Sequence, residues 1–186
     1  GVVDSTAISR VCPIRNGTLA DTLNVWGRIG FGIKALDYMD GTSNNYGVYH
    51  VELFVDDSLR FESRMDNFSF AETRLINAWA DYTRYVNDGE WFLRSFIQGN
   101  NPLRAVKADD ARGIINFDEE RLYEVEYRLS DNHGNSSVYR FCVRGTKQDI
   151  PPFAKEGHYL LWFLNNMLEY DAFSLNVPAG ELFDNT

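Results

Sequence analysis

Residues 25–73 read VWGRIGFGIKALDYMDGTSNNYGVYHVELFVDDSLRFESRMDNFSFAET, and this stretch decides the fold. Apolar residues alternate along two segments, so each segment places an apolar row on one face, as a β-strand does. The rows are Ile29, Phe31, Ile33 and Ala35, and Tyr49, Val51, Leu53 and Val55. Turn residues separate the segments, which predicts a meander of three strands over residues 25–36, 48–55 and 59–65.

The first predicted strand contains three glycines, Gly27, Gly30 and Gly32. Glycine weakens a strand unless a bulge or a close approach requires it. We therefore expect a bend, or a side chain that packs across the strand, at these positions.

Size and charge limit the function. The chain has 186 residues, 44% of them hydrophobic, which suffices for one sandwich-sized core. A net charge of −9 disfavours nucleic acid and anionic lipid as partners, because both attract clustered Lys and Arg. No apolar run approaches the roughly 20 residues of a membrane-spanning helix, so we expect no membrane insertion. The chain begins without an initiator Met, which favours a mature or trimmed chain.

The pattern changes over residues 69–97. Ser69 and Glu72 form a capping box, and apolar residues then recur every three or four positions, which predicts one helix or two short helices. Strands resume at residues 113–117, and residues 122–129 and 137–143 predict a hairpin.

These elements predict an all-β fold, an immunoglobulin-like β-sandwich, over residues 1–145, with a helical insertion at about 69–97. Residues 146–186 are expected to form a linker and a C-terminal strand pair, from strands at residues 159–164 and 173–177. The pair either packs on the sandwich or opens an incomplete second domain.

An ordered set of short motifs resembles a known family. The motifs are Gly30-Phe31-Gly32-Ile33-Lys34-Ala35, Tyr46-Gly47-Val48-Tyr49, Phe68-Ser69-Phe70 with Glu72-Thr73-Arg74, Gly113-Ile114-Ile115 and Asp131-x-x-Gly134-Asn135. Together they resemble the non-catalytic β-sandwich accessory domain that follows the catalytic domain in secreted bacterial zinc metallopeptidases of the lysostaphin/LytM type. The resemblance covers roughly residues 4–145 and returns as Pro178-x-Gly180-x-Leu182-Phe183-Asp184.

The resemblance implies an accessory role. It predicts a module of an exported, cell-wall-directed (peptidoglycan) metallopeptidase, which spaces, orients or regulates the catalytic domain. The implied partners are the upstream catalytic domain or a neighbouring module, and peptidoglycan or another cell-envelope glycan. The implied location is periplasmic or extracellular. The alternative is an independent glycan-binding or protein-binding module.

The peptidase chemistry itself is not expected in this chain. Such peptidases hold zinc through His-x-x-x-Asp and a later His-x-His, and neither motif occurs in the sequence. The three histidines, His50, His133 and His158, are scattered, so we expect ordinary surface or hydrogen-bonded histidines. We therefore predict no catalytic residue, no metal site and no cofactor, and no enzymatic activity for this chain.

Other polar groups have an ordinary structural explanation. Asp37, Asp40 and Asn44 could supply oxygens to calcium, but their spacing does not match a calcium loop and suits turn capping better. Asp109-Asp110 and Glu119-Glu120 are more typical of solvated turns than of acid–base pairs. Cys12 and Cys142 either pair as a disulfide or remain two separate thiols.

Aromatic residues of the insertion form the candidate binding surface. They are Trp79, Tyr82, Tyr85, Trp91 and Phe92. Exposed aromatic patches mark binding surfaces, and such a patch suits sugar rings or a partner chain. Packing of the helix onto the sheet explains the same residues, because their spacing is that of a buried face. Tyr85 lies off the apolar stripe and is the best candidate for exposure. The stripe consists of Leu75, Ile76, Trp79, Tyr82 and Val86.

Overall fold

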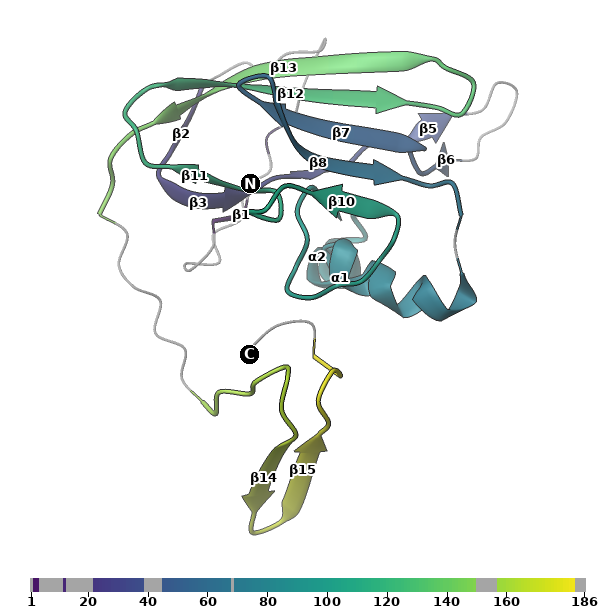
Figure 1. The fold of residues 1–186 in the computed structure, drawn as a ribbon, viewed down its shortest axis with the longest axis vertical. Coiled ribbons are helices and arrows are strands. Elements are labelled where there is room, and N and C mark those ends of the chain that lie inside the picture. Colours follow the sequence, from purple (N-terminus) through teal and green to yellow (C-terminus); the bar gives the residue numbers. More distant parts are fainter. Residues whose placement is uncertain are drawn as a thin grey trace.

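The structure is a computed structural model that describes residues 2–3, 12, 22–38, 45–67, 69–149 and 157–182. Strands dominate its regular structure, with a short 3-10 helix and two short helices between them, which confirms an all-β fold with a helical insertion (Figure 1). The elements in chain order are β1 (Val2–Val3), β2 (Leu23–Val25), β3 (Gly27–Gly30), β4 (Gly32–Ile33), β5 (Asp37–Tyr38), β6 (Asn45–Tyr46), β7 (His50–Val55), β8 (Ser58–Arg64), η1 (Phe70–Leu75), α1 (Ile76–Trp79), α2 (Tyr82–Asp88), β9 (Leu93–Arg94), β10 (Val106–Ala108), β11 (Ile114–Phe117), β12 (Leu122–Ser130), β13 (Ser136–Gly145), β14 (Asn166–Tyr170) and β15 (Phe173–Val177).

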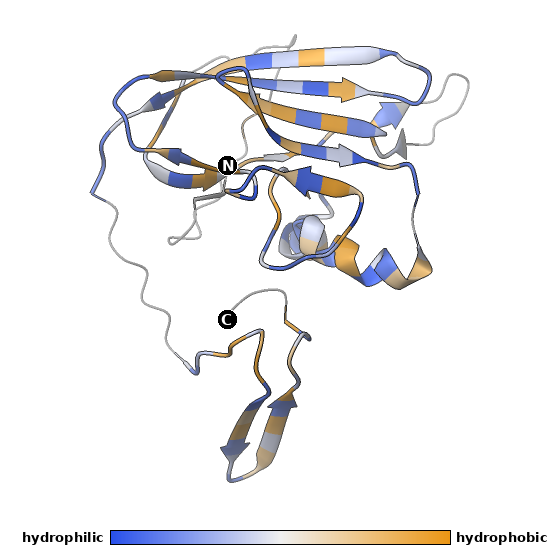
Figure 2. Ribbon diagram, in the orientation of Figure 1, coloured by the Kyte–Doolittle hydropathy of each residue, from blue (hydrophilic) through white to orange (hydrophobic). Residues whose placement is uncertain are grey.

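The largest sheet has six strands in the order β10-β8-β7-β12-β13-β2. The predicted hairpin is present, since β12 and β13 pair from Leu122 with Arg144 to Ser130 with Ser136. Alternate side chains of β12 are buried, namely Tyr123, Val125, Tyr127 and Leu129. The bands of colour along these strands in Figure 2 show the same alternation. One face of the sheet therefore meets the core and the other meets water.

A second sheet, β1-β3-β11, contributes to the same core. Ile29 of β3 and Phe117 of β11 are buried together with Leu53 of β7 and Val143 of β13. Smaller pairs, β4-β9 and β5-β6, complete the arrangement, and β2 runs parallel to β13. Because the sheets are small and mixed, the immunoglobulin-like topology is not confirmed by this arrangement and stays a prediction.

The predicted three-stranded meander is wrong. β7 and β8 do form a hairpin, but the strand expected over residues 25–36 is divided. β2 pairs with β13, whereas β3 pairs with β1 and β11. β4 pairs with β9, so the three pieces belong to three different sheets. β12 is the other neighbour of β7.

Glycines explain this division. Gly27 has a φ of +78°, which side-chain-bearing residues rarely adopt, and it lies where the chain leaves one sheet for the next. A Cβ on Gly30 would lie 2.5 Å from the ring of Phe96, which crosses the strand there. The expected bend and the expected crossing side chain are therefore both present.

The C-terminal part differs from its prediction in one strand. β15 covers the predicted residues 173–177, but its partner β14 covers residues 166–170, so the strand predicted at 159–164 is wrong. The side chain of Asn166 hydrogen-bonds Leu161 and Leu164 and holds residues 161–166 in a loop. Among the described residues β14 and β15 pair only with each other. Residues 150–156 of the predicted linker lie outside the described part, and the domain boundary stays a prediction.

Candidate functional site

The helical insertion breaks in the middle of the predicted apolar stripe. α1 ends at Trp79 because Ala80 is extended, with a ψ of 154°, and forms a bridge with Leu93. α2 then begins anew, with the Asp81 carboxylate accepting from the N–H of Arg84 at 3.3 Å. The break shifts the helical phase, so the face that α1 buries is not continued by α2. No residue of α2 is buried.

As a result, three aromatic rings lie at the surface. Tyr82 is 50% exposed, Tyr85 is 46% exposed, and Trp91, just beyond α2, is 37% exposed. The ring centroids of Tyr82 and Tyr85 are 6.3 Å apart, and those of Tyr85 and Trp91 are 5.0 Å apart, edge to face. We call these three residues the aromatic surface. The exposure expected for Tyr85 is present.

Two of the five candidate residues do not belong to this surface. Trp79 is buried, and its indole N–H donates to the carbonyl oxygen of Arg94 at 2.9 Å. Phe92 is half-buried, with the guanidinium of Arg84 5.2 Å from its ring centroid. For Trp79 the packing explanation is correct, because it lies on the face of α1 that meets the core.

Charged side chains border the aromatic surface. Arg84 lies 3.8 Å from Asp81, 3.7 Å from Asp88 and 3.9 Å from Glu90. Lys34, from the segment after β4, lies 3.1 Å from Glu90. The border thus has three carboxylates and two cations, each in an ion pair.

Sequence reasoning missed this border and the exposure of Val86, which is 61% exposed. Val86 was expected to be buried, because it continues the apolar spacing of Trp79 and Tyr82. Asp81 carried a usable signal, because aspartate is a preferred N-cap residue and can mark the start of a new helix. The approach of Lys34 had no local signal, since it lies 56 residues from Glu90 in the sequence.

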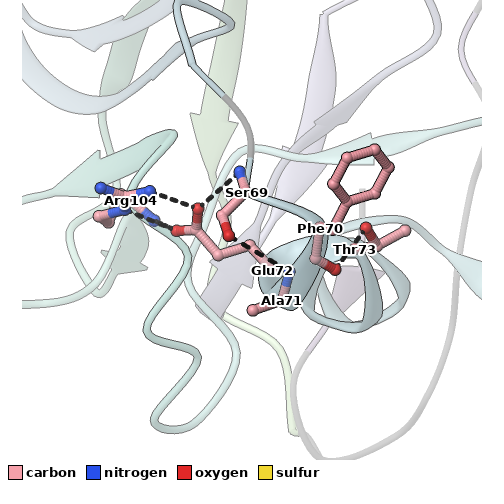
Figure 3. Close-up of polar contacts among 6 residues, drawn as sticks. All are labelled: Ser69, Phe70, Ala71, Glu72, Thr73 and Arg104. Atoms are coloured by element: carbon pink, nitrogen blue, oxygen red, sulfur yellow. Dashed lines mark hydrogen bonds and ion pairs between the residues drawn. The ribbon is translucent and has the colours of Figure 1, made fainter.

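The predicted capping box is present at the start of the insertion (Figure 3). The hydroxyl of Ser69 accepts from the N–H of Ala71, and the Glu72 carboxylate accepts from the N–H of Ser69 at 3.1 Å. Arg104 forms a bidentate ion pair with Glu72, in which Nε donates to Oε1 at 2.9 Å and Nη2 donates to Oε2 at 2.7 Å. The hydrogen bonds from Arg104, with those from the backbone N–H groups of Ser69 and Arg104, lower the pKa of Glu72 to about 2. Glu72 therefore holds the fold and is not poised for proton transfer.

One further constellation escaped sequence reasoning. The register of β7 and β12 brings Ser130 Oγ to 3.4 Å from His50 Nδ1, and His50 Nε2 lies 3.0 Å from Glu62 Oε1. A serine nucleophile also needs N–H donors aimed at the developing oxyanion. Ser130 pairs in the sheet with both His50 and Ser136, so its surrounding backbone is committed to strand pairing. We interpret the three residues as a cross-strand polar cluster.

The remaining candidate groups lie apart. His133 is in the turn after β12, and His158 packs against Tyr170 with ring centroids 5.9 Å apart. Asp109 binds Arg60, and Glu119 binds Arg121. Asp40 and Asn44 lie outside the described residues. Among the residues that the structure describes, no three His, Cys, Asp or Glu side chains are grouped as metal ligands would be.

The cysteines are both free in the structure, with Cys12 half-buried and Cys142 exposed. A disulfide in an oxidising compartment and two separate thiols stay the two alternatives. Counting the reactive thiols of the denatured protein tests it, because two thiols would exclude the disulfide.

Comparison of the chain with protein-family models, curated proteins and solved structures finds no match. The resemblance to the accessory domain of zinc metallopeptidases therefore stays a prediction. None of the helices in the described parts of the chain has the length and apolar character required to cross a membrane.

Proposed function

We propose that this chain is a non-catalytic accessory module of an exported zinc metallopeptidase that acts on peptidoglycan, and that it spaces, orients or regulates the catalytic domain. The observation that carries the proposal is the position of the resembling residues. Gly30 admits Phe96, Glu72 caps η1, and Asp131 holds the turn between β12 and β13 by accepting from the N–H groups of His133 and Asn135. These residues build a scaffold.

The fold proposed for this scaffold is an immunoglobulin-like sandwich. Two sheets that share one core support it, since a sandwich buries the inner faces of two sheets against each other. Its partners would be the upstream catalytic domain or a neighbouring module, in the periplasm or outside the cell.

The polar groups that could do chemistry are engaged in holding the fold, which supports a non-catalytic role. Glu72 binds Arg104, Asp109 binds Arg60 and the N–H of Gly113, and His50 binds Glu62. The contacts of Glu72 with Arg104 and of Asp109 with Arg60 join segments that are distant in sequence, and the contact of His50 with Glu62 joins β7 to β8, so each group has a structural task.

Two experiments test the accessory role. Sequencing the gene upstream of the codon for residue 1 should find His-x-x-x-Asp and His-x-His encoded in the same reading frame. Zymography on peptidoglycan then compares the full-length parent with the same protein lacking residues 1–145. We expect the shortened protein to clear peptidoglycan at a changed rate or with a changed cleavage pattern. Identical clearing and identical products would contradict the proposal.

A second candidate is an independent binding module, which the exposed aromatic surface favours. Aromatic rings at the surface carry a large apolar area that a ligand can cover. An upstream region without either zinc motif would favour this candidate over the accessory role. An NMR titration with muropeptides tests it, and an unmoved Trp91 indole signal would count against glycan binding.

A further inference from the structure

Tyr82, Tyr85 and Trp91 form a platform on one side of the helical insertion. Tyr82 and Tyr85 are three residues apart on α2, which places them on the same side of the helix. Gly89 ends α2 with a φ of +69°, and this left-handed turn reverses the chain so that Trp91 meets Tyr85. Covering ring surface that is left in water in this way is favourable.

The platform is held from both ends. The N–H of Asp81 donates to the carbonyl of Phe92 at 2.9 Å, which fastens the start of α2 to the segment that carries Trp91. The N–H of Gly89 donates to the carbonyl of Tyr85 at 3.0 Å and closes the last turn. Because the rings sit on a fastened loop, a ligand would order few further groups on binding.

The charges at the border select the chemistry of the ligand. Asp81, Asp88 and Glu90 are paired with Arg84 and Lys34, so a cationic ligand would have to displace an existing cation. An anionic ligand would meet this acidic border on a protein whose net charge is −9. The nearly balanced border therefore complements a neutral ligand.

From these observations we infer that the aromatic surface binds a neutral saccharide, with sugar rings lying against Tyr85 and Trp91. A pyranose has an apolar C–H face, which suits an aromatic ring, and hydroxyl groups at its edge. Asp88, Glu90 and Lys34 offer those hydroxyls charged hydrogen-bonding partners. The inference rests on the binding role described above as the second candidate, and it names its ligand class.

The test uses the complete 186-residue chain labelled with ¹⁵N and titrated with the tetramer of β-1,4-linked N-acetylglucosamine. The indole signal of Trp91 should shift in a saturable way. The indole signal of Trp79, which is buried and hydrogen-bonded to Arg94, should stay in place and report that the fold is intact.

Variants locate the binding. Trp91→Ala and Tyr85→Ala should each weaken binding about tenfold, as expected for aromatic anchors. Tyr85→Phe keeps the ring and should retain affinity within about twofold. An unchanged indole signal of Trp79 in each variant shows that the fold is intact. The control is Tyr159→Ala, because Tyr159 is 65% exposed outside the insertion, and this variant should bind as the unchanged protein does.

Two results would overturn the inference. One is an unmoved Trp91 signal at about 10 mM tetramer, which means that the dissociation constant lies well above this concentration. The other is a shift of Trp91 with a Lys-rich peptide and none with the tetramer, which would assign the surface to a protein partner. Either result leaves the zymography comparison untouched, so failure of the saccharide and failure of the accessory role are separate outcomes.

Discussion

The hydroxyl of Tyr127 donates to Ser95 Oγ at 2.7 Å inside the core. Tyr127 comes from β12, whereas Ser95 follows β9, and both side chains are buried. Burial raises the pKa of Tyr127, so the phenol stays protonated and keeps its donor. The bond therefore joins the helical insertion to the centre of the six-stranded sheet.

Breaking this bond from one side should be costly. Tyr127→Phe leaves Ser95 Oγ without its donor, and Ser95→Ala leaves the phenol without its acceptor, so each should lower the free energy of unfolding by about 1–3 kcal/mol. The double variant should lose at least about 0.5 kcal/mol less than the sum, because neither orphaned group remains. Urea unfolding measures all three. Tyr85→Phe, at an exposed ring, is the control, and strict additivity would mean that the bond contributes nothing.

Gly145 lies at the end of β13 where backbone approaches backbone. A Cβ at this position would lie 2.0 Å from the carbonyl oxygen of Glu119, so the chain must shift to accept it. Gly145→Ala should lower the free energy of unfolding by about 1–3 kcal/mol, as overpacking does. Gly47 has open space around it, and Gly47→Ala should change stability by less than about 0.5 kcal/mol. Equal effects in thermal unfolding of the two variants would contradict the close approach.

The turn between β7 and β8 places two aspartates in the left-handed region. Asp56 has a φ of 49° and Asp57 a φ of 59°. Asp57→Gly should raise the free energy of unfolding by about 0.5 kcal/mol, because glycine relieves this strain. Asp56→Gly should lower it by about 0.5–1.5 kcal/mol, since the Asp56 carboxylate accepts from the N–H of Glu124 at 2.9 Å and pairs with Arg121. Changes of the same sign in chemical denaturation would show that the side-chain contacts of Asp56 are unimportant.

Alternation was sufficient to predict the rows that build the core. Alternate residues of two strands are buried as their spacing requires, because a strand has only two faces. They are Val51, Leu53 and Val55 on β7, and Tyr123, Val125, Tyr127 and Leu129 on β12. Pairing could not be predicted in the same way. β12 lies beside β7 although about 70 residues separate them, and such a register depends on the whole core.

The candidate site was predicted in part, and the helix break explains the difference. The apolar spacing of residues 75–86 predicted one helix or two short helices, and only an unbroken helix would bury Tyr82 and Val86 beside Trp79. The bridge between Ala80 and Leu93 interrupts that helix. Leu93 also pairs with Ile33 of β4, which is distant in sequence. Local spacing therefore identified the aromatic cluster, the exposure of Tyr85 and the burial of Trp79, but it placed Tyr82 on the buried face although Tyr82 is exposed.

The Glu72–Arg104 contact predicts a change of stability with pH. Hydrogen bonds from Arg104 hold the pKa of Glu72 at about 2, below its value of 4.5 in an unfolded chain. A carboxylate with a depressed folded pKa contributes stability above the unfolded pKa, and this contribution is lost as the pH falls through the folded pKa. Glu72→Gln should therefore lower the urea midpoint at pH 7, and the difference from the unchanged protein should shrink between about pH 4.5 and pH 2.

Two further variants make this measurement specific. Arg104→Ala removes the main cause of the depressed pKa, so it should give the same narrowing of the difference toward low pH. Glu120→Gln changes an exposed carboxylate and should leave the pH profile unaltered. A deficit in Glu72→Gln that stays constant from pH 7 to the acid limit would contradict the argument. The Glu72 side chain would then stabilise η1 through hydrogen bonds that do not depend on its charge. The ion pair with Arg104 would contribute nothing to the free energy of unfolding.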